Sequence, residues 1–113
     1  MNDGLFVGQI NFILGRIYDL KHDYDNAIFF HEKHLNLARQ NQDSKGQCRA
    51  YFLLSQLYEK LNQYDKAKKF LQLYKELNRA MEKSNSAQVR FLSLVFFSLF
   101  NFLCRFHVLN QLV

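Results

Sequence analysis

Two histidines close together on one segment are the side chains of this chain best suited to chemistry. His31 and His34 flank Glu32, and histidines three residues apart on a helix can share a face that holds a divalent cation. A hydrolytic zinc helix, however, has the spacing His-Glu-x-x-His, which places its histidines four residues apart. The spacing here is one residue shorter and no third ligand is evident, so we interpret both histidines as packing and hydrogen-bonding residues.

Other chemical patterns are incomplete. Asp23, Asp25 and Asn26 resemble the start of a calcium loop, but the glycine and the closing glutamate that such a loop needs are missing. Cys48 and Cys104 have neither metal nor redox spacing, and we interpret them as reduced packing residues of an intracellular protein. No glycine-rich phosphate loop and no nucleophile–base pattern is present. The sequence therefore predicts no enzymatic activity, no cofactor and no metal site.

The elements around these residues are predicted to be helices, because apolar residues recur at a spacing of three or four. Four such stripes occupy residues 12–18, 24–38, 50–58 and 64–77. Lys21-His22-Asp23 and Leu61-Asn62-Gln63 separate the stripes of each pair and are predicted to be turns. The chain contains no proline and no strand pattern, so an all-α fold is expected.

The two pairs of stripes are copies of each other at a spacing of 40 residues. The matching residues are Leu14 with Leu54, Tyr18 with Tyr58, Tyr24 with Tyr64, Asp25 with Asp65, and Ala27 with Ala67. Small residues, Gly15 and Ser55, lie where paired helices must approach closely. Asp43 and Ser44 are candidates for the N-cap of the third helix. A repeat that preserves packing residues and varies the surface is typical of a stacked helical array, which binds partners more often than it catalyses.

The pattern Leu14-Gly15-x-x-Tyr18, followed by Tyr24 and Ala27, resembles the tetratricopeptide repeat, and the second copy differs mainly in having Ser55 for the glycine. The usual period of that repeat is about 34 residues. The longer period resembles the Pins/LGN group of scaffolds, whose second helix is similar to Ala27–Ala38 and whose link is similar to Asp43–Tyr51.

This resemblance implies two helix-turn-helix repeats, at about residues 4–40 and 44–83, within a domain of residues 1–83 of a right-handed α-solenoid. First helices would line a concave groove that binds a peptide. The implied groove residues are Gln9, Phe12, Ile13, Arg16, Asp19, Arg49, Phe52, Leu53, Gln56 and Glu59. Arg49 matches the arginine with which the Pins/LGN group holds a peptide, whereas Leu53 replaces the accompanying asparagine.

The function expected from this resemblance is that of a non-enzymatic scaffold or adaptor in the cytoplasm or nucleus that binds a protein or peptide. The net charge is +5, and the basic excess lies on the last repeat helix. Its lysines do not share one face and no base-reading motif accompanies them, so we expect a solvated surface and no nucleic-acid binding. Since roughly three repeats are needed for stability, a fragment or short isoform of a longer array is expected.

Residues 84–113 form a tail of different composition, which includes the run FLSLVFFSLFNFLC from Phe91 to Cys104. Three interpretations remain open. The tail could be a helix that caps the array as an aberrant third repeat. It could be a membrane anchor through Phe91–Leu103, which would make the chain a membrane-attached adaptor. It could also be a translated intron, since Val89-Arg90 can be encoded by the usual start of an intron.

Overall fold

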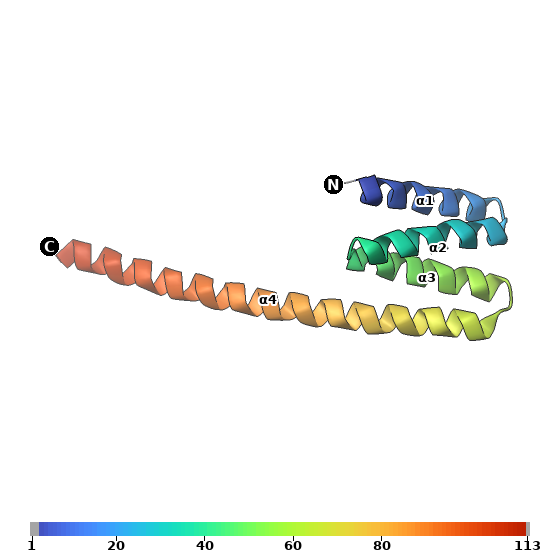
Figure 1. The fold of residues 1–113 in the computed structure, drawn as a ribbon. Helices are drawn as coiled ribbons and strands as arrows, with labels where there is room; N and C mark the ends of the chain where they lie inside the picture. The colour runs from blue at the N-terminus through green and yellow to red at the C-terminus, as the bar shows by residue number, and fades with distance from the viewer. Residues whose placement is uncertain (1–2, 113) are drawn as a thin grey trace. The chain divides into compact units, whose positions relative to one another are not determined.

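The computed structural model describes residues 3–112, except for the side chains of Leu5, Leu109 and Leu112. Its four helices are α1 (Asp3–Leu20), α2 (Tyr24–Gln40), α3 (Ser44–Lys60) and α4 (Tyr64–Leu112), as Figure 1 shows. No strand occurs within residues 3–112, so the expected all-α class is confirmed. The chain divides into two compact units, Met1–Arg79 and Ala80–Val113, which are described separately.

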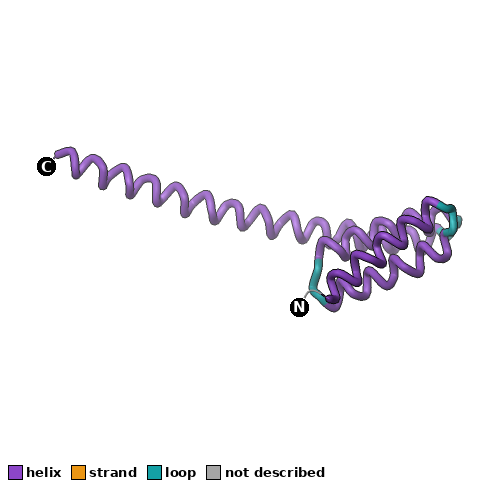
Figure 2. Tube along the Cα trace, turned by 90° about the horizontal axis from the view of Figure 1, so that it is seen from above, coloured by secondary structure: helices purple, strands orange, loops and turns teal. Residues whose placement is uncertain are grey.

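The three turns between the helices, drawn in teal in Figure 2, share one backbone geometry. In each turn the residue after the helix C-cap has a positive φ: 60° at His22, 53° at Gln42 and 60° at Asn62. The N–H of the following residue donates to a carbonyl five positions earlier, as from Asp23 to Tyr18 at 2.9 Å. This Schellman arrangement closes each helix and lets the next one begin at once. Both predicted turns are confirmed.

This turn geometry explains the 40-residue period. Successive helices begin at Tyr24, Ser44 and Tyr64, so each helix with its turn spans 20 residues and a pair spans 40. Asp43 is the N-cap of α3, because its side chain accepts a hydrogen bond from the Gly46 N–H at 3.0 Å, whereas Ser44 is the first helical residue. Compared with a 34-residue repeat, each helix is longer by about one turn.

The core of the first unit lies between α2, α3 and the beginning of α4. Its buried residues are Ala27, Ile28, Leu35, Ala50, Tyr51, Leu54, Leu57, Tyr58 and Ala67. Gly15 and Ser55 are also buried, as expected for positions of close helix approach. The repeat preserves even the ring contacts. Tyr18 stacks on Phe30 with centroids 5.4 Å apart, and Tyr58 stacks on Phe70 at 5.6 Å.

The Phe-rich tail is helical, as expected, but it is the continuation of α4 rather than a separate helix. Met81, Glu82 and Lys83 stand 40 residues after the turn at 41–43. All three are strong helix formers, and none is the aspartate that caps α3. The stop and start signals of the earlier turns are therefore absent here, which explains why the helix does not end.

Candidate peptide-binding groove

The first helices of the two repeats, α1 and α3, line an open pocket of about 690 Å³ near their C-terminal ends. Arg16, Asp19 and Leu20 line it from α1, and Gln56, Glu59 and Lys60 line it from α3, with His22 at the rim. Four of the residues predicted for the groove, Arg16, Asp19, Gln56 and Glu59, are thus brought together around this one space.

An ion pair joins the two helices across this pocket. The Lys60 Nζ lies 2.7 Å from Asp19 Oδ1, and the Arg16 guanidinium lies 3.9 Å from Asp19 Oδ2. Asp19 therefore pairs with both Lys60 and Arg16, and Glu59 is the other acidic group that lines this pocket. Sequence reasoning missed Lys60, because its partner is 41 residues away and the repeat does not preserve surface charges.

The other end of α1 and α3 carries a second, smaller pocket of about 220 Å³, whose lining includes Gln9 and Arg49. The Arg49 guanidinium lies 4.9 Å from the centroid of the Phe12 ring, within cation–π range, and so connects α3 to α1. The Phe12 ring contacts the His34 ring at 5.6 Å. Its repeat equivalent, Phe52, contacts Tyr74 at 5.2 Å, so both groove aromatics rest on a ring of the second helix.

The Tetratricopeptide repeat family profile matches residues 6–80, which is most of the chain. The chain belongs to the tetratricopeptide repeat family. Repeats of this family mediate protein–protein interactions and are typically not catalytic. A search of curated proteins found no match.

In this tetratricopeptide repeat protein, the apolar residues predicted for the groove differ in exposure. Phe52 is 39% exposed and offers surface to a ligand, whereas Ile13, which is 53% exposed, lies on the face of α1 whose equivalent on α3 is covered by α2. Leu53, in contrast, is only 8% exposed and serves mainly in packing. Gln9 and Gln56 are exposed and can donate and accept hydrogen bonds.

The histidines lie behind this groove. The Nδ1–H of His34 donates to the Gly8 carbonyl at 2.8 Å, since a carbonyl can only accept. Burial lowers the pKa of His34, so its ring is neutral at pH 7 and supports Phe12 as an apolar surface. Within residues 3–112 the structure contains no group of three or more His, Cys, Asp or Glu side chains that could hold a metal ion. Burial also raises the pKa of the Cys48 thiol, which keeps it protonated at neutral pH.

Proposed function

We propose that the α1–α3 groove binds a segment of a partner protein, and that the chain is a non-enzymatic scaffold or adaptor. The observation that carries this proposal is the placement of Phe12 and Phe52 on the two first helices. Phe52 is 39% exposed, and Phe12 lies at 4.9 Å beneath the guanidinium of Arg49. Exposed aromatic side chains beside a charged group are the features that anchor peptides and protein interfaces.

The charges at the two ends of the groove indicate the chemistry of the ligand. Arg49 at one end suits an acidic side chain, and Glu59 at the other suits a basic one. The length of the repeat supports a place near the Pins/LGN group, but Leu53 is buried where that group has a peptide-binding asparagine. A ligand more apolar at its centre than those of the Pins/LGN group is therefore proposed.

Two repeats bury little core, so we further propose that residues 1–83 act as part of a longer array, or as a short isoform of one, in the cytoplasm. Each repeat contacts only its neighbours, and additional repeats would lengthen the groove. The affinity of these two repeats alone is then expected to be weak.

The test is a selection of random linear peptides displayed on phage against the full chain. Selected peptides are then measured by fluorescence anisotropy on the chain and on the variants Arg49→Ala and Phe52→Ala. Both variants should weaken binding at least about fivefold, since aromatic and arginine anchors typically contribute about 1–3 kcal/mol. Lys69→Ala on α4 is the control, because Lys69 lies outside the α1–α3 groove. Equal binding to all four proteins would contradict the proposal.

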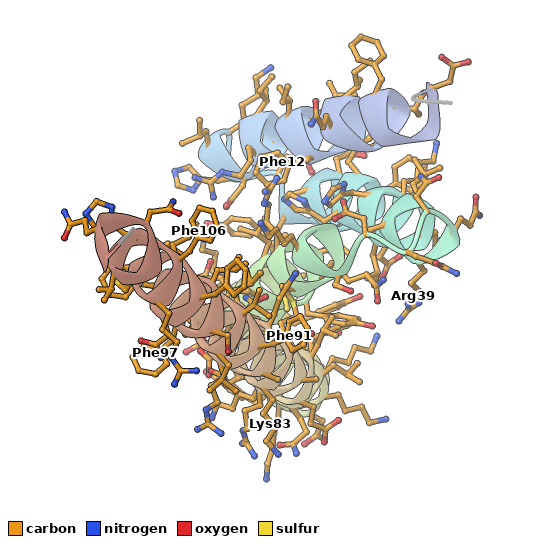
Figure 3. The ribbon with its side chains drawn as sticks, turned by 90° about the vertical axis from the view of Figure 1, so that its left-hand side faces the viewer. Phe12, Arg39, Lys83, Phe91, Phe97 and Phe106 are labelled. Carbon is orange, nitrogen blue, oxygen red and sulfur yellow. The ribbon has the colours of Figure 1, made fainter. Side chains whose placement is uncertain are left out.

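A second candidate function, attachment to a membrane, is favoured by one observation on the tail. Within the helical segment Tyr64–Val108, a stretch of 18 residues with at most two charged side chains is apolar enough to cross a bilayer by length and composition. Phe91, Phe97 and Phe106 point away from α4 in different directions, as Figure 3 shows, so apolar groups surround the helix. A helix that is apolar all round suits either a protein core or a lipid environment.

Flotation with phosphatidylcholine vesicles tests this candidate. The full chain should float with the vesicles, and the double variant Leu94→Asp, Phe97→Asp should remain at the bottom of the gradient, because charges are costly in the bilayer core. The double variant Lys68→Asp, Lys75→Asp in the repeat region is the control for added negative charge. If none of the three proteins floats, or if all three float, attachment through the tail is contradicted.

A further inference from the structure

A row of exposed apolar side chains runs along the face of α1 that points away from α2. It consists of Phe6, Ile10, Ile13, Ile17 and Leu20, which we call the α1 seam, and these side chains are between 41% and 77% exposed. Their spacing alternates between four and three residues, as along the contact line of a coiled coil. The opposite face of the helix, with Gly8, Asn11 and Gly15, is buried.

The second repeat shows how such a row is normally covered. Ala50, Leu53 and Leu57 are the repeat equivalents of Ile10, Ile13 and Ile17, and they are only 0%, 8% and 1% exposed. The second helix α2 approaches α3 closely on this side, since a β-carbon placed on Gly46 would lie 3.2 Å from that of Ala38. The α1 seam is therefore a packing surface rather than an ordinary solvated face.

Two residues at the N-terminal end of the seam are bulkier than their equivalents on α3, whereas Ile13 and Ile17 match Leu53 and Leu57 in size. Phe6 stands at the repeat position of Gly46, and Ile10 stands at that of Ala50. A helix that packed as α2 does would collide with these larger side chains. The seam instead suits the wider separation of a coiled-coil contact, in which large apolar side chains interlock.

Head-to-tail stacking of α4 from another copy on the seam is also unfavourable. In α2 the residues Leu35 and Ala38 are buried among the helices of the core. Their equivalents on α4 are Lys75 and Asn78. In such a stack Lys75 would contact the isoleucines of α1, and removing its charged ammonium group from water would cost a large amount of free energy.

We propose that two copies of this chain associate through their α1 seams, antiparallel and related by a two-fold axis at Ile13. The seam is nearly symmetric about this residue, so Ile13 packs on the partner's Ile13 and Ile10 packs on the partner's Ile17. Phe6 then lies beside the partner's Leu20.

The charges at the ends of α1 determine the direction of pairing. Asp3 is exposed in the first turn of α1, and Lys21 is exposed in the turn that follows α1, with its Nζ 6.0 Å from the centroid of the Tyr18 ring. Antiparallel pairing brings Asp3 close to the partner's Lys21, twice per dimer. Parallel pairing would place Asp3 beside the partner's Asp3 and Lys21 beside the partner's Lys21, and such contacts between like charges are destabilising. The contact involves one helix per copy, which is less than the standard interface of about 800 Å² per partner, so a weak dimer is expected.

Directed disulfide formation tests both the contact and its direction in the full chain. The background is Cys104→Ser, which removes the exposed native thiol, while the buried Cys48 stays. Single variants Phe6→Cys and Leu20→Cys are oxidised alone and as a mixture. Antiparallel pairing predicts that the mixture gives several-fold more cross-linked dimer than either variant alone, and that Ile13→Cys cross-links with itself.

Leu73→Cys on α4 is the matched control, because Leu73 is 38% exposed and lies outside the seam. Non-specific association would cross-link Leu73→Cys as well as the seam variants, and that result would overturn the proposal. Self-cross-linking of Phe6→Cys and Leu20→Cys equal to that of their mixture would overturn the antiparallel arrangement.

Charge reversal supplies an independent measurement by sedimentation equilibrium. Asp3→Lys should weaken dimerisation several-fold, and the double variant Asp3→Lys, Lys21→Asp should restore it, because the reversed pairs attract again. Failure of the second substitution to restore association would overturn the predicted proximity of these two residues.

Discussion

His31 lies directly against Gly15 and leaves no room for a side chain between α1 and α2. A β-carbon placed on Gly15 would lie 2.6 Å from His31 Cε1. His31 is 0% exposed, and its ring also contacts Phe12 at 6.0 Å between centroids. This contact therefore sets the distance between the first two helices and supports an aromatic residue of the proposed groove.

Gly15→Ala should destabilise the fold by about 1–3 kcal/mol, because a buried ring or the backbone must move to admit a methyl group. Gly8→Ala is the matched control on the same helix, since its β-carbon would meet His34 Nδ1 at 3.6 Å and Leu37 Cβ at 3.8 Å, both ordinary contacts. Alanine favours a helix over glycine by up to about 1 kcal/mol, so Gly8→Ala should be neutral or stabilising. Urea unfolding followed by circular dichroism measures both, and equal effects would contradict the tight contact.

The burial of His31 should make the fold sensitive to acid. Burial, helped by His34 and Arg16 and opposed by Asp19, lowers the pKa of His31 from 6.5 to about 4. Between these values the unfolded chain binds more protons than the folded one, so stability falls as the pH drops from 6.5 toward 4. At about 1.4 kcal/mol per pH unit, this loss is on the order of 3 kcal/mol.

His31→Leu should raise the stability at pH 7 and flatten its pH dependence. The second repeat has Leu71 at this position, and neither ring nitrogen of His31 has a hydrogen-bond partner among the described residues 3–112. Removing a buried polar group without partners should stabilise the fold by about 1–3 kcal/mol. Urea unfolding at several pH values compares this variant with His107→Leu, a change at an exposed histidine. An unchanged slope in His31→Leu would show that His31 is not the source of the acid sensitivity.

Gln42→Gly should stabilise the turn between α2 and α3 by about 0.5–1 kcal/mol. Gln42 has a φ of 53°, a left-handed conformation that costs energy for residues with a side chain and little for glycine. The greater freedom of glycine in the unfolded chain offsets part of the gain. Gln40→Gly, at the last helical position of α2, should instead destabilise. Thermal melts of the two variants must therefore shift in opposite directions.

Gln63→Asp should stabilise the start of α4 by about 0.5–1 kcal/mol. Gln63 occupies the position that Asp23 and Asp43 occupy in the other two turns, since its carbonyl accepts from the Ala67 N–H at 3.0 Å. An aspartate there can also accept a hydrogen bond from the first turn of the helix. The reverse change, Asp43→Ala, should cost about 1 kcal/mol at the start of α3. Calorimetry measures both, and a destabilising Gln63→Asp would contradict the equivalence of the turns.

Most of the fold could be predicted because its signals are local. The stripes at 24–38 and 50–58, the turn at His22 and the cap at Asp43 each depend on residues within one or two helical turns of one another. The placement of groove residues was less predictable. Leu53 has the same pattern position as the exposed Ile13, yet it is 8% exposed because α2 covers that side of α3.

The sequence by itself determined the helices, their turns and the 40-residue repeat, because hydrogen bonding and capping within a helix involve neighbours in the chain. Only the tertiary structure decided which faces are covered. It buried His31 against Gly15, paired Asp19 with Lys60 across 41 residues, and left the α1 seam exposed. Periodicity shows that a face is apolar, but the surface that packs against it depends on contacts between distant segments, which a local pattern does not specify.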